Sequence, residues 1–223
     1  MKLSIDSSRL PDYLTRQIEQ CFPDGNERWQ SDVRHCCSVA LERIEYCFRH
    51  IPKKYYQDQG EPVFNHMNAD HYASFLYFVS YQAAQAGNEA LAERAFYLNK
   101  ALHGLDLFYA VKMPDIFMLV HPVGTVIGNA NFSDYLVIYQ NVTIGADVAG
   151  IYPVFAGDNV IYSGASVIGN CHIGRNSVIG ARSFIRKQSD GAENSLYSGL
   201  YPAVRVTPNT GSVRQDFFTE KNQ

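Results

Sequence analysis

A six-residue period runs through the second half of the chain and constrains its fold more than any other feature. Large apolar side chains recur at this interval without a slip, at Phe155, Ile161, Val167, Ile173, Ile179 and Ile185. Small side chains recur two positions earlier, at Ala165, Cys171, Ser177 and Ser183. A period of six fits neither an amphipathic helix nor an alternating strand. It fits a triangular parallel β-helix, in which each six residues form one flat side and a corner, with the large residues stacked inside.

The period continues upstream through Phe132, Ile138 and Ile144, but one interval is longer. Three sides make one coil of about eighteen residues, so the region is predicted to hold about three coils. Eleven residues rather than six separate Ile144 from Phe155, so five residues must leave the coil. Residues 145–153 are therefore expected to form a protruding loop, and such loops on rigid scaffolds often carry binding chemistry.

The first half of the chain, up to about residue 110, has the apolar spacing of helices instead. Helices are expected at residues 26–50, 68–86 and 89–102, with a surface connection at 51–64. Asn68 or Asp70 is placed to cap the second helix, and a short apolar segment ends at Pro114. We therefore divide the chain into a helical domain, a β-helix domain and a C-terminal tail, at residues 1–113, 114–206 and 207–223.

Composition and charge favour a globular cytoplasmic protein. Hydrophobic residues make up 46% of the chain, charged residues 18%, and the formal net charge is -3. Because there is no basic cluster, we expect no nucleic acid or membrane partner. The N-terminal residues lack the apolar core of a signal peptide, and the most apolar stretch, Ser74–Val79, is too short to span a bilayer. The five cysteines show no paired spacing, which favours reduced thiols.

Three segments resemble the serine acetyltransferases, a family of hexapeptide-repeat acyltransferases. Residues 118–128, MLVHPVGTVIG, are similar to that family's segment with the catalytic histidine, residues 138–145, IYQNVTIG, to the coil that follows, and residues 165–185 to its closing coils. In all, the resemblance covers residues 66–206. It implies an α+β fold, in which an N-terminal α-helical domain is followed by a left-handed parallel β-helix of hexapeptide repeats.

The resemblance also implies an activity and a set of site residues. It implies acetyl-CoA as the donor co-substrate, transfer to a hydroxyl, no metal, and a homotrimer or a dimer of trimers with active sites between subunits. His121 is the expected general base, since an imidazole can accept the proton of an attacking hydroxyl. The residues expected to bind acetyl-CoA are Gly164, Gly180, Ala181, Arg182 and Gly199. Those expected to bind the acceptor are Asp70, Asn129, Gln140 and Tyr152.

Each acceptor residue also has a structural interpretation. Asp70 is placed to cap a helix, Asn129 and Gln140 to lie on solvated corners, and Tyr152 to pack on a neighbouring subunit. Where the family has a second histidine in its loop the chain has Tyr152, and Val120 and Asn129 replace two acidic residues. These changes remove charges expected to hold serine. The acceptor therefore stays open between serine and another small hydroxyl, a sugar hydroxyl, or an amine.

Two other functions share this fold. A metal-dependent hydratase of the carbonic anhydrase type would need about three histidine ligands, and only His121 and His172 fall within the repeats. A non-catalytic scaffold subunit would keep the fold without turnover. The adjacent residues His35, Cys36 and Cys37 point to different sides of a helix, so we expect no metal there. Cys171 is expected in the core and His172 on the surface.

Overall fold

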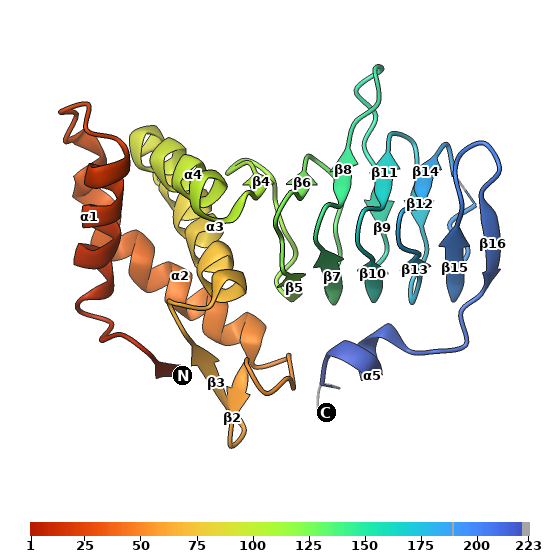
Figure 1. Ribbon diagram of the computed structural model, residues 1–223, viewed down its shortest axis with the longest axis horizontal. Coiled ribbons are helices and arrows are strands. Elements are labelled where there is room, and N and C mark those ends of the chain that lie inside the picture. The colour runs from red at the N-terminus through yellow and green to blue at the C-terminus, as the bar shows by residue number, and fades with distance from the viewer. Residues whose placement is uncertain (189, 220–223) are drawn as a thin grey trace.

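The computed structural model describes residues 1–188 and 190–219, so residues 220–223 of the predicted tail lie outside the described part. Two parts lie side by side, a bundle of helices and a three-sided prism of parallel strands (Figure 1). The predicted order, helices followed by a parallel β-helix, is confirmed. No helix in these described ranges is long and apolar enough to cross a membrane.

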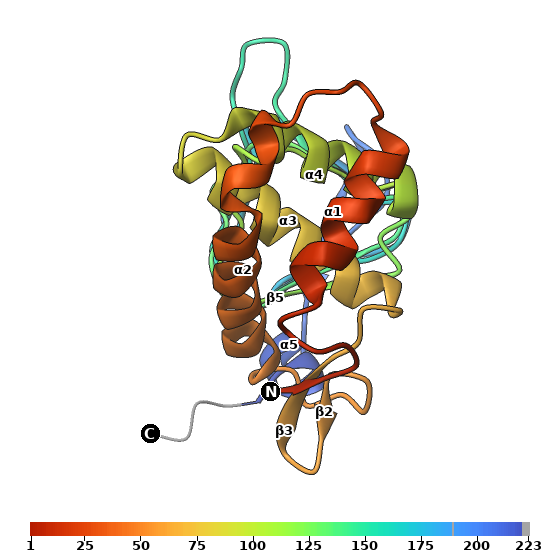
Figure 2. The same cartoon turned by 90° about the vertical axis from the view of Figure 1, so that its left-hand side faces the viewer.

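The helical part contains four α-helices and one short sheet. Its helices are α1 (Leu10–Cys21), α2 (Val33–Phe48), α3 (Ala69–Gln85) and α4 (Glu89–His103), with a 3-10 turn at Arg28–Asp32 before α2. The sheet has the order β1 (Lys2–Leu3), β3 (Glu61–Phe64) and β2 (Gln57–Asp58). The helices cover the end of the prism at β5 (Figure 2). One packing contact there is the Cys47 thiol, which donates to the Phe117 carbonyl oxygen at 3.1 Å.

Helix ends follow the capping residues of the sequence. The Asn68 side chain caps α3, because its oxygen accepts the backbone N–H groups of Asp70 and His71. Gly104 closes α4 with a φ of +62°, the left-handed conformation that glycine adopts easily. The segment after Gly104 differs from the helical rhythm expected up to about residue 110, because β4 (Asp106–Leu107) pairs in parallel with β6 (Val126–Ile127) of the prism. The expected surface connection 51–64 contains β2 and β3.

The prism has three faces, each a ladder of short strands. The first face consists of β5 (Phe117–Val120), β7 (Leu136–Tyr139), β10 (Asn159–Ile161), β13 (Val178–Ile179) and β15 (Ser195–Ser198), with antiparallel β16 (Arg205–Pro208) at its edge. The second face consists of β4, β6, β8 (Thr143–Gly145), β11 (Ser166–Ile168) and β14 (Phe184–Arg186). The third face holds β9 (Val154–Phe155) and β12 (His172–Ile173). The prism therefore has about five coils, and the expected three were too few.

The strand register confirms the six-residue interpretation. Ile161 pairs with Ile179 and Val167 with Ile185, one eighteen-residue coil later. All six anchors and all four small residues are buried, Cys171 included, whereas His172 is exposed. Ile144 pairs with Val167, five residues further than one regular coil. The extra residues form the protruding loop after β8, which leaves the prism at the top of Figure 1.

The C-terminal segment turns back toward the helices. α5 (Val213–Phe217) follows β16, and the Arg214 guanidinium donates to the buried Asp158 carboxylate at 2.7 Å. The Thr219 N–H then donates to the His50 carbonyl oxygen at 2.8 Å. This segment ties the last coil of the prism to the helical part.

Candidate active site

His121 lies at the corner where the first face meets the second. β5 ends at Val120, and the chain turns with His121 at a φ of +48°, in the left-handed region. The turn is held by the Val123 N–H, which donates to the His121 carbonyl oxygen at 2.7 Å. The His121 side chain is 77% exposed, so its imidazole is accessible to solvent at this corner of the prism.

Asp70 reaches His121 from the first turn of α3. Because Asn68 caps this helix, the expectation that Asp70 is the N-cap is wrong, and its carboxylate is available for other contacts. Asp70 Oδ1 accepts the backbone N–H of His121 at 3.1 Å, and Oδ2 lies 3.8 Å from His121 Nδ1. The 3.8 Å separation is too long for a hydrogen bond, so the carboxylate acts on the imidazole through its charge.

The Asp70 carboxylate is far less exposed than the histidine that it approaches. Its side chain is 15% exposed, and burial raises the pKa of this carboxyl, partly offset by the His121 N–H and the imidazole charge. The next residue, His71, is fully buried, and burial lowers the pKa of its imidazole to about 4. His71 is therefore neutral near pH 7, and His121 is the imidazole that lies beside the Asp70 carboxylate.

Gln140 occupies the same corner in the next coil. Val120 pairs with Tyr139, which places the following residues, His121 and Gln140, next to each other along the corner. Gln140 Oε1 is buried and accepts no hydrogen bond from any residue that the structure describes. A buried acceptor left unpaired costs about 1–3 kcal/mol, so this oxygen is a candidate to bind a polar group of a ligand.

The residues expected to bind acetyl-CoA follow this corner along the prism. Gly164 and the segment 180–182 each stand between a strand of the first face and the next strand of the second face. Gly199 follows β15 of the first face, and the adjacent Leu200 forms a parallel bridge to Phe184 of the second face. Backbone bonds connect the coils here, because Gly164 N–H donates to the Gln140 carbonyl oxygen and Arg182 N–H to that of Ser163. The stem of Arg182 lies over Gly164, where an added Cβ would be 3.4 Å from its Cγ. One continuous edge thus leads from His121 to Arg182.

Asn129 and Tyr152 lie elsewhere in the chain. β6 crosses the second face, so Asn129 stands at the far edge of that face from His121. The protruding loop joins the second face to the third at the same far edge, where the Asn131 N–H donates to the Pro153 carbonyl oxygen at 2.9 Å. Tyr152 is 45% exposed there. Within one chain, the structure therefore groups Asp70, Gln140 and the coenzyme residues with His121, and leaves Asn129 and Tyr152 apart.

The protruding loop has a defined tip. Asp147 Oδ1 accepts the N–H groups of Ala149 and Ile151 at 3.0 and 3.1 Å. The loop therefore holds its shape through its own turn, and Val148 at its tip is fully exposed. Across residues 1–188 and 190–219, no three or more His, Cys, Asp and Glu side chains are grouped to hold a metal ion.

Comparison with known proteins identifies similar sequences and folds. No family model matches the chain. It is 31% identical over 137 residues to a putative serine acetyltransferase of Schizosaccharomyces pombe, covering 60% of this chain and 50% of that protein. It is 30% identical over 192 residues to a plasmid serine acetyltransferase of Synechococcus elongatus, covering 78% of this chain and 54% of that protein. The chain thus spans about half the length of these curated relatives.

The solved structures agree on the fold. The serine acetyltransferase of Neisseria gonorrhoeae superposes with a TM-score of 0.69 at 18% identity, over 94% of this chain and 82% of that one. The chain resembles the serine acetyltransferases in sequence and fold. Another similar structure is the serine acetyltransferase of Brucella abortus in complex with coenzyme A, with a TM-score of 0.59 at 17% identity over 90% and 74% of the two chains.

Proposed function

We propose that this serine acetyltransferase-like chain is an acetyl-CoA-dependent O-acetyltransferase with His121 as its general base. The observation that supports this most is the exposed His121 imidazole beside the partly buried Asp70 carboxylate, at the corner along which the residues expected to bind acetyl-CoA lie. A carboxylate beside one ring nitrogen leaves the other nitrogen to work on a substrate, as in other histidine bases oriented by a carboxylate.

The reaction follows from this arrangement. His121 Nε2 takes the proton of the acceptor hydroxyl while the hydroxyl oxygen attacks the thioester carbonyl carbon of acetyl-CoA. The negative Asp70 carboxylate stabilises the imidazolium that forms. When the tetrahedral intermediate collapses, the carbon–sulfur bond breaks and the imidazolium returns its proton to the leaving thiolate. The products are the O-acetylated acceptor and free coenzyme A.

The corner beyond His121 suits the donor. Ala181 and Gly199 are exposed on this edge and carry little or no side chain, so an extended molecule can approach the backbone there. Arg182 is exposed on it, and a guanidinium is a good partner for phosphate oxygens. The similar serine acetyltransferase of Brucella abortus was solved in complex with coenzyme A, which supports the same donor here.

The acceptor site is proposed to need two copies of the chain. Gln140 lies beside His121, whereas Asn129 and Tyr152 stand at the far edge of the second face. If prisms pack around a threefold axis, the far edge of one copy can face the His121 edge of the next. We therefore propose a homotrimer or a dimer of trimers in the cytoplasm, with Tyr152 supplied by the neighbour.

The acceptor class follows from the groups at these edges. Gln140, Asn129 and Tyr152 offer amides and a hydroxyl but no charge, which suits a hydroxyl compound bound through neutral hydrogen bonds. A sugar hydroxyl or another uncharged hydroxyl compound meets this condition. Serine also carries an ammonium and a carboxylate, so binding it would need charged partners beyond these three residues. Tyr152 in place of a second histidine also favours a second candidate function, a β-helical subunit without turnover.

The experiment is an acceptor panel. Purified protein is incubated with acetyl-CoA and serine, homoserine, a hexose or a hexosamine, while released thiol is followed by absorbance and the product by mass spectrometry. The proposal predicts thiol release that depends on one acceptor, with one acetyl group added to its oxygen. Binding of acetyl-CoA without release on any acceptor would favour the non-catalytic subunit, and N-acetylated hexosamine would favour the amine alternative.

A further inference from the structure

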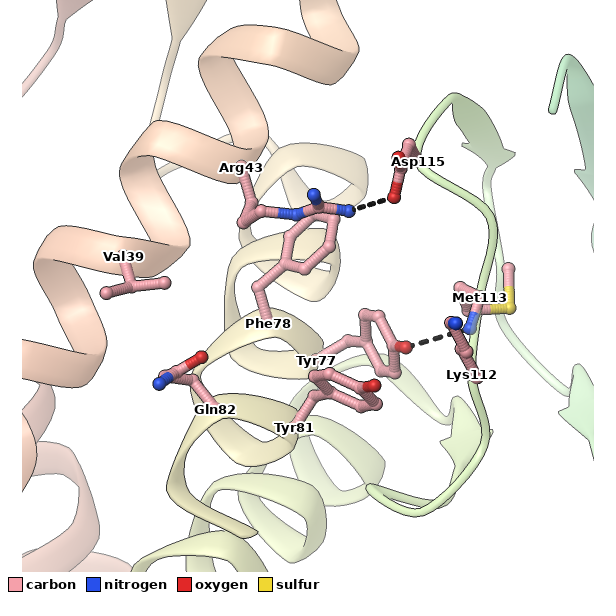
Figure 3. A pocket seen from close by; sticks show the side chains of 9 residues that line it. All are labelled: Val39, Arg43, Tyr77, Phe78, Tyr81, Gln82, Lys112, Met113 and Asp115. Atoms are coloured by element: carbon pink, nitrogen blue, oxygen red, sulfur yellow. Dashed lines mark hydrogen bonds and ion pairs between the residues drawn. The ribbon is translucent and has the colours of Figure 1, made fainter. Parts of the chain in front are cut away.

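A cavity of about 250 Å³ lies away from the His121 corner, between α2, α3 and the segment that leads into β5 (Figure 3). Arg43 enters it from α2, Tyr81 and Gln82 from α3, and Lys112 from the segment opposite. The cavity is large enough for a metabolite-sized molecule and is smaller than most drug-binding pockets.

The walls of this cavity are held in place by specific contacts. The Tyr77 hydroxyl donates to the Val111 carbonyl oxygen at 2.8 Å and accepts the Met113 N–H at 3.0 Å. On the other side, Arg43 pairs with Asp115 at 2.5 Å. The Arg43 guanidinium also lies 5.6 Å from the centre of the Phe78 ring. Because both walls are fixed, the cavity exists before any ligand binds.

The charges around the cavity leave one cation without a partner. Arg43 and Asp115 neutralise each other, whereas Lys112 has no ion pair with any residue in the described ranges. The side chains of Tyr81 and Gln82 likewise make no hydrogen bond within the described chain, and they offer a hydroxyl and an amide. The rings of Tyr77, Phe78 and Tyr81 line the cavity on the side of α3 (Figure 3). The cavity thus joins a positive rim to an apolar interior.

We infer that this cavity binds a small carboxylate with an aromatic or branched apolar body. The carboxylate is placed at the Lys112 ammonium, and the body lies against the rings of Phe78 and Tyr81. The site also connects to the candidate active site through the backbone. The Asp115 N–H donates to Asp134 at 2.9 Å, and the chain continues through β5 to His121. Binding is measured without turnover, so the inference does not rest on the proposed acyl transfer.

The test uses three probes with one body and different charge: 3-phenylpropionate, 3-phenylpropan-1-ol and 3-phenylpropylamine. Each is titrated into 15N-labelled full-length protein, and the amide resonances of Lys112, Met113 and Asp115 are followed. The anion should bind most tightly and the amine most weakly. The Lys112→Gln variant should weaken binding of the anion about fivefold while leaving the alcohol unchanged, because Lys112 is exposed and its charge is screened.

Two further variants separate this cavity from other surfaces. Lys54→Gln removes an exposed lysine that lies over the Tyr55 ring, and it should leave all three affinities unchanged. Val39→Phe fills the cavity from α2 and should abolish the shifts for every probe, with the melting temperature checking that the protein is folded. Equal affinity for the three probes would overturn the inference. So would shifts that persist in Val39→Phe, or the absence of any saturable shift.

Discussion

Replacing Asp70 by asparagine tests the contact on which the proposed base depends. The carboxylate Oδ2 lies 3.8 Å from His121 Nδ1, and Oδ1 accepts the His121 N–H at 3.1 Å. Asparagine keeps an oxygen for the N–H and removes the charge. Asp70→Asn therefore removes only the charge beside the imidazole, whereas Asp70→Ala removes both this charge and the hydrogen bond to the His121 N–H.

The structure sets the size of the effect. Two unit charges at 3.8 Å interact by about 1 kcal/mol in water and about 4 kcal/mol at the effective dielectric constant of a protein surface. Because His121 is 77% exposed, solvent screens the pair and we take about 1 kcal/mol. This energy stabilises the imidazolium in the transition state, so kcat/KM should fall about fivefold in Asp70→Asn. Asp70→Ala should lose about 1 kcal/mol more, the value of the hydrogen bond.

The same variant should gain stability at neutral pH. Burial raises the pKa of the Asp70 carboxyl, so the folded state disfavours its ionised form. The stability that comes with the protonated carboxyl is present at low pH and is lost as pH rises through the folded-state pKa. Because asparagine cannot ionise, Asp70→Asn should melt at a higher temperature than wild type at pH 7. The difference in melting temperature between the variant and wild type should shrink as pH falls below about 4, where the Asp70 carboxyl is protonated and therefore as neutral as asparagine.

Initial rates of thiol release and thermal melts between pH 3 and pH 8 measure both effects. The matched control is Asp12→Asn, which removes an exposed carboxylate of α1 that pairs with Arg34. This control should change neither kcat/KM nor the melting temperature. Unchanged kcat/KM in Asp70→Asn would refute the electrostatic role of Asp70. A lower melting temperature at pH 7 would refute the reasoning from burial.

Three further predictions concern the loop, the corner and the prism interior. Tyr152→His restores the residue of the resembling family, and we expect more thiol release with serine, whereas no gain would indicate a different acceptor pocket. Gln140→Leu removes the buried unpaired oxygen, so it should raise the melting temperature and the KM of the acceptor; a lower KM would contradict its binding role. Ile161→Ala empties a fully buried anchor and should cost about 3 kcal/mol in urea unfolding, against less than about 0.5 kcal/mol for Ser166→Ala.

The prism could be predicted from the sequence because each coil repeats the same local rule. An aliphatic residue at every sixth position has one way to be buried in register, so the run from Phe155 to Ile185 determined the fold and the length of the loop. The first coil was missed because its register changes. Leu119 pairs with Ile138, a separation one residue longer than a regular coil of eighteen. Ile127 pairs with Ile144, a separation one residue shorter. β4 and β6 therefore carry no regular signal.

The candidate site could be predicted only in part, for a physical reason. His121, Gln140 and Arg182 share a corner because the coil length brings them there. In the sequence these residues were identified by the resemblance to the serine acetyltransferases. Asp70 reaches His121 from a helix in the other half of the chain. Its contact depends on how the helices pack on the first coil, which no local pattern encodes. Its place near a helix start suggested a cap, which Asn68 provides instead.

The central claim is that His121 is the base of an acyl transfer. The most direct test is the rate of thiol release from acetyl-CoA with the best acceptor of the panel, for wild type, His121→Ala and His172→Ala. His172 is also an exposed histidine of the prism, on β12 away from the corner. We predict that His121→Ala loses about 100-fold or more in kcat, the range of general base catalysis, while His172→Ala equals wild type. A His121→Ala variant as active as wild type would contradict the account.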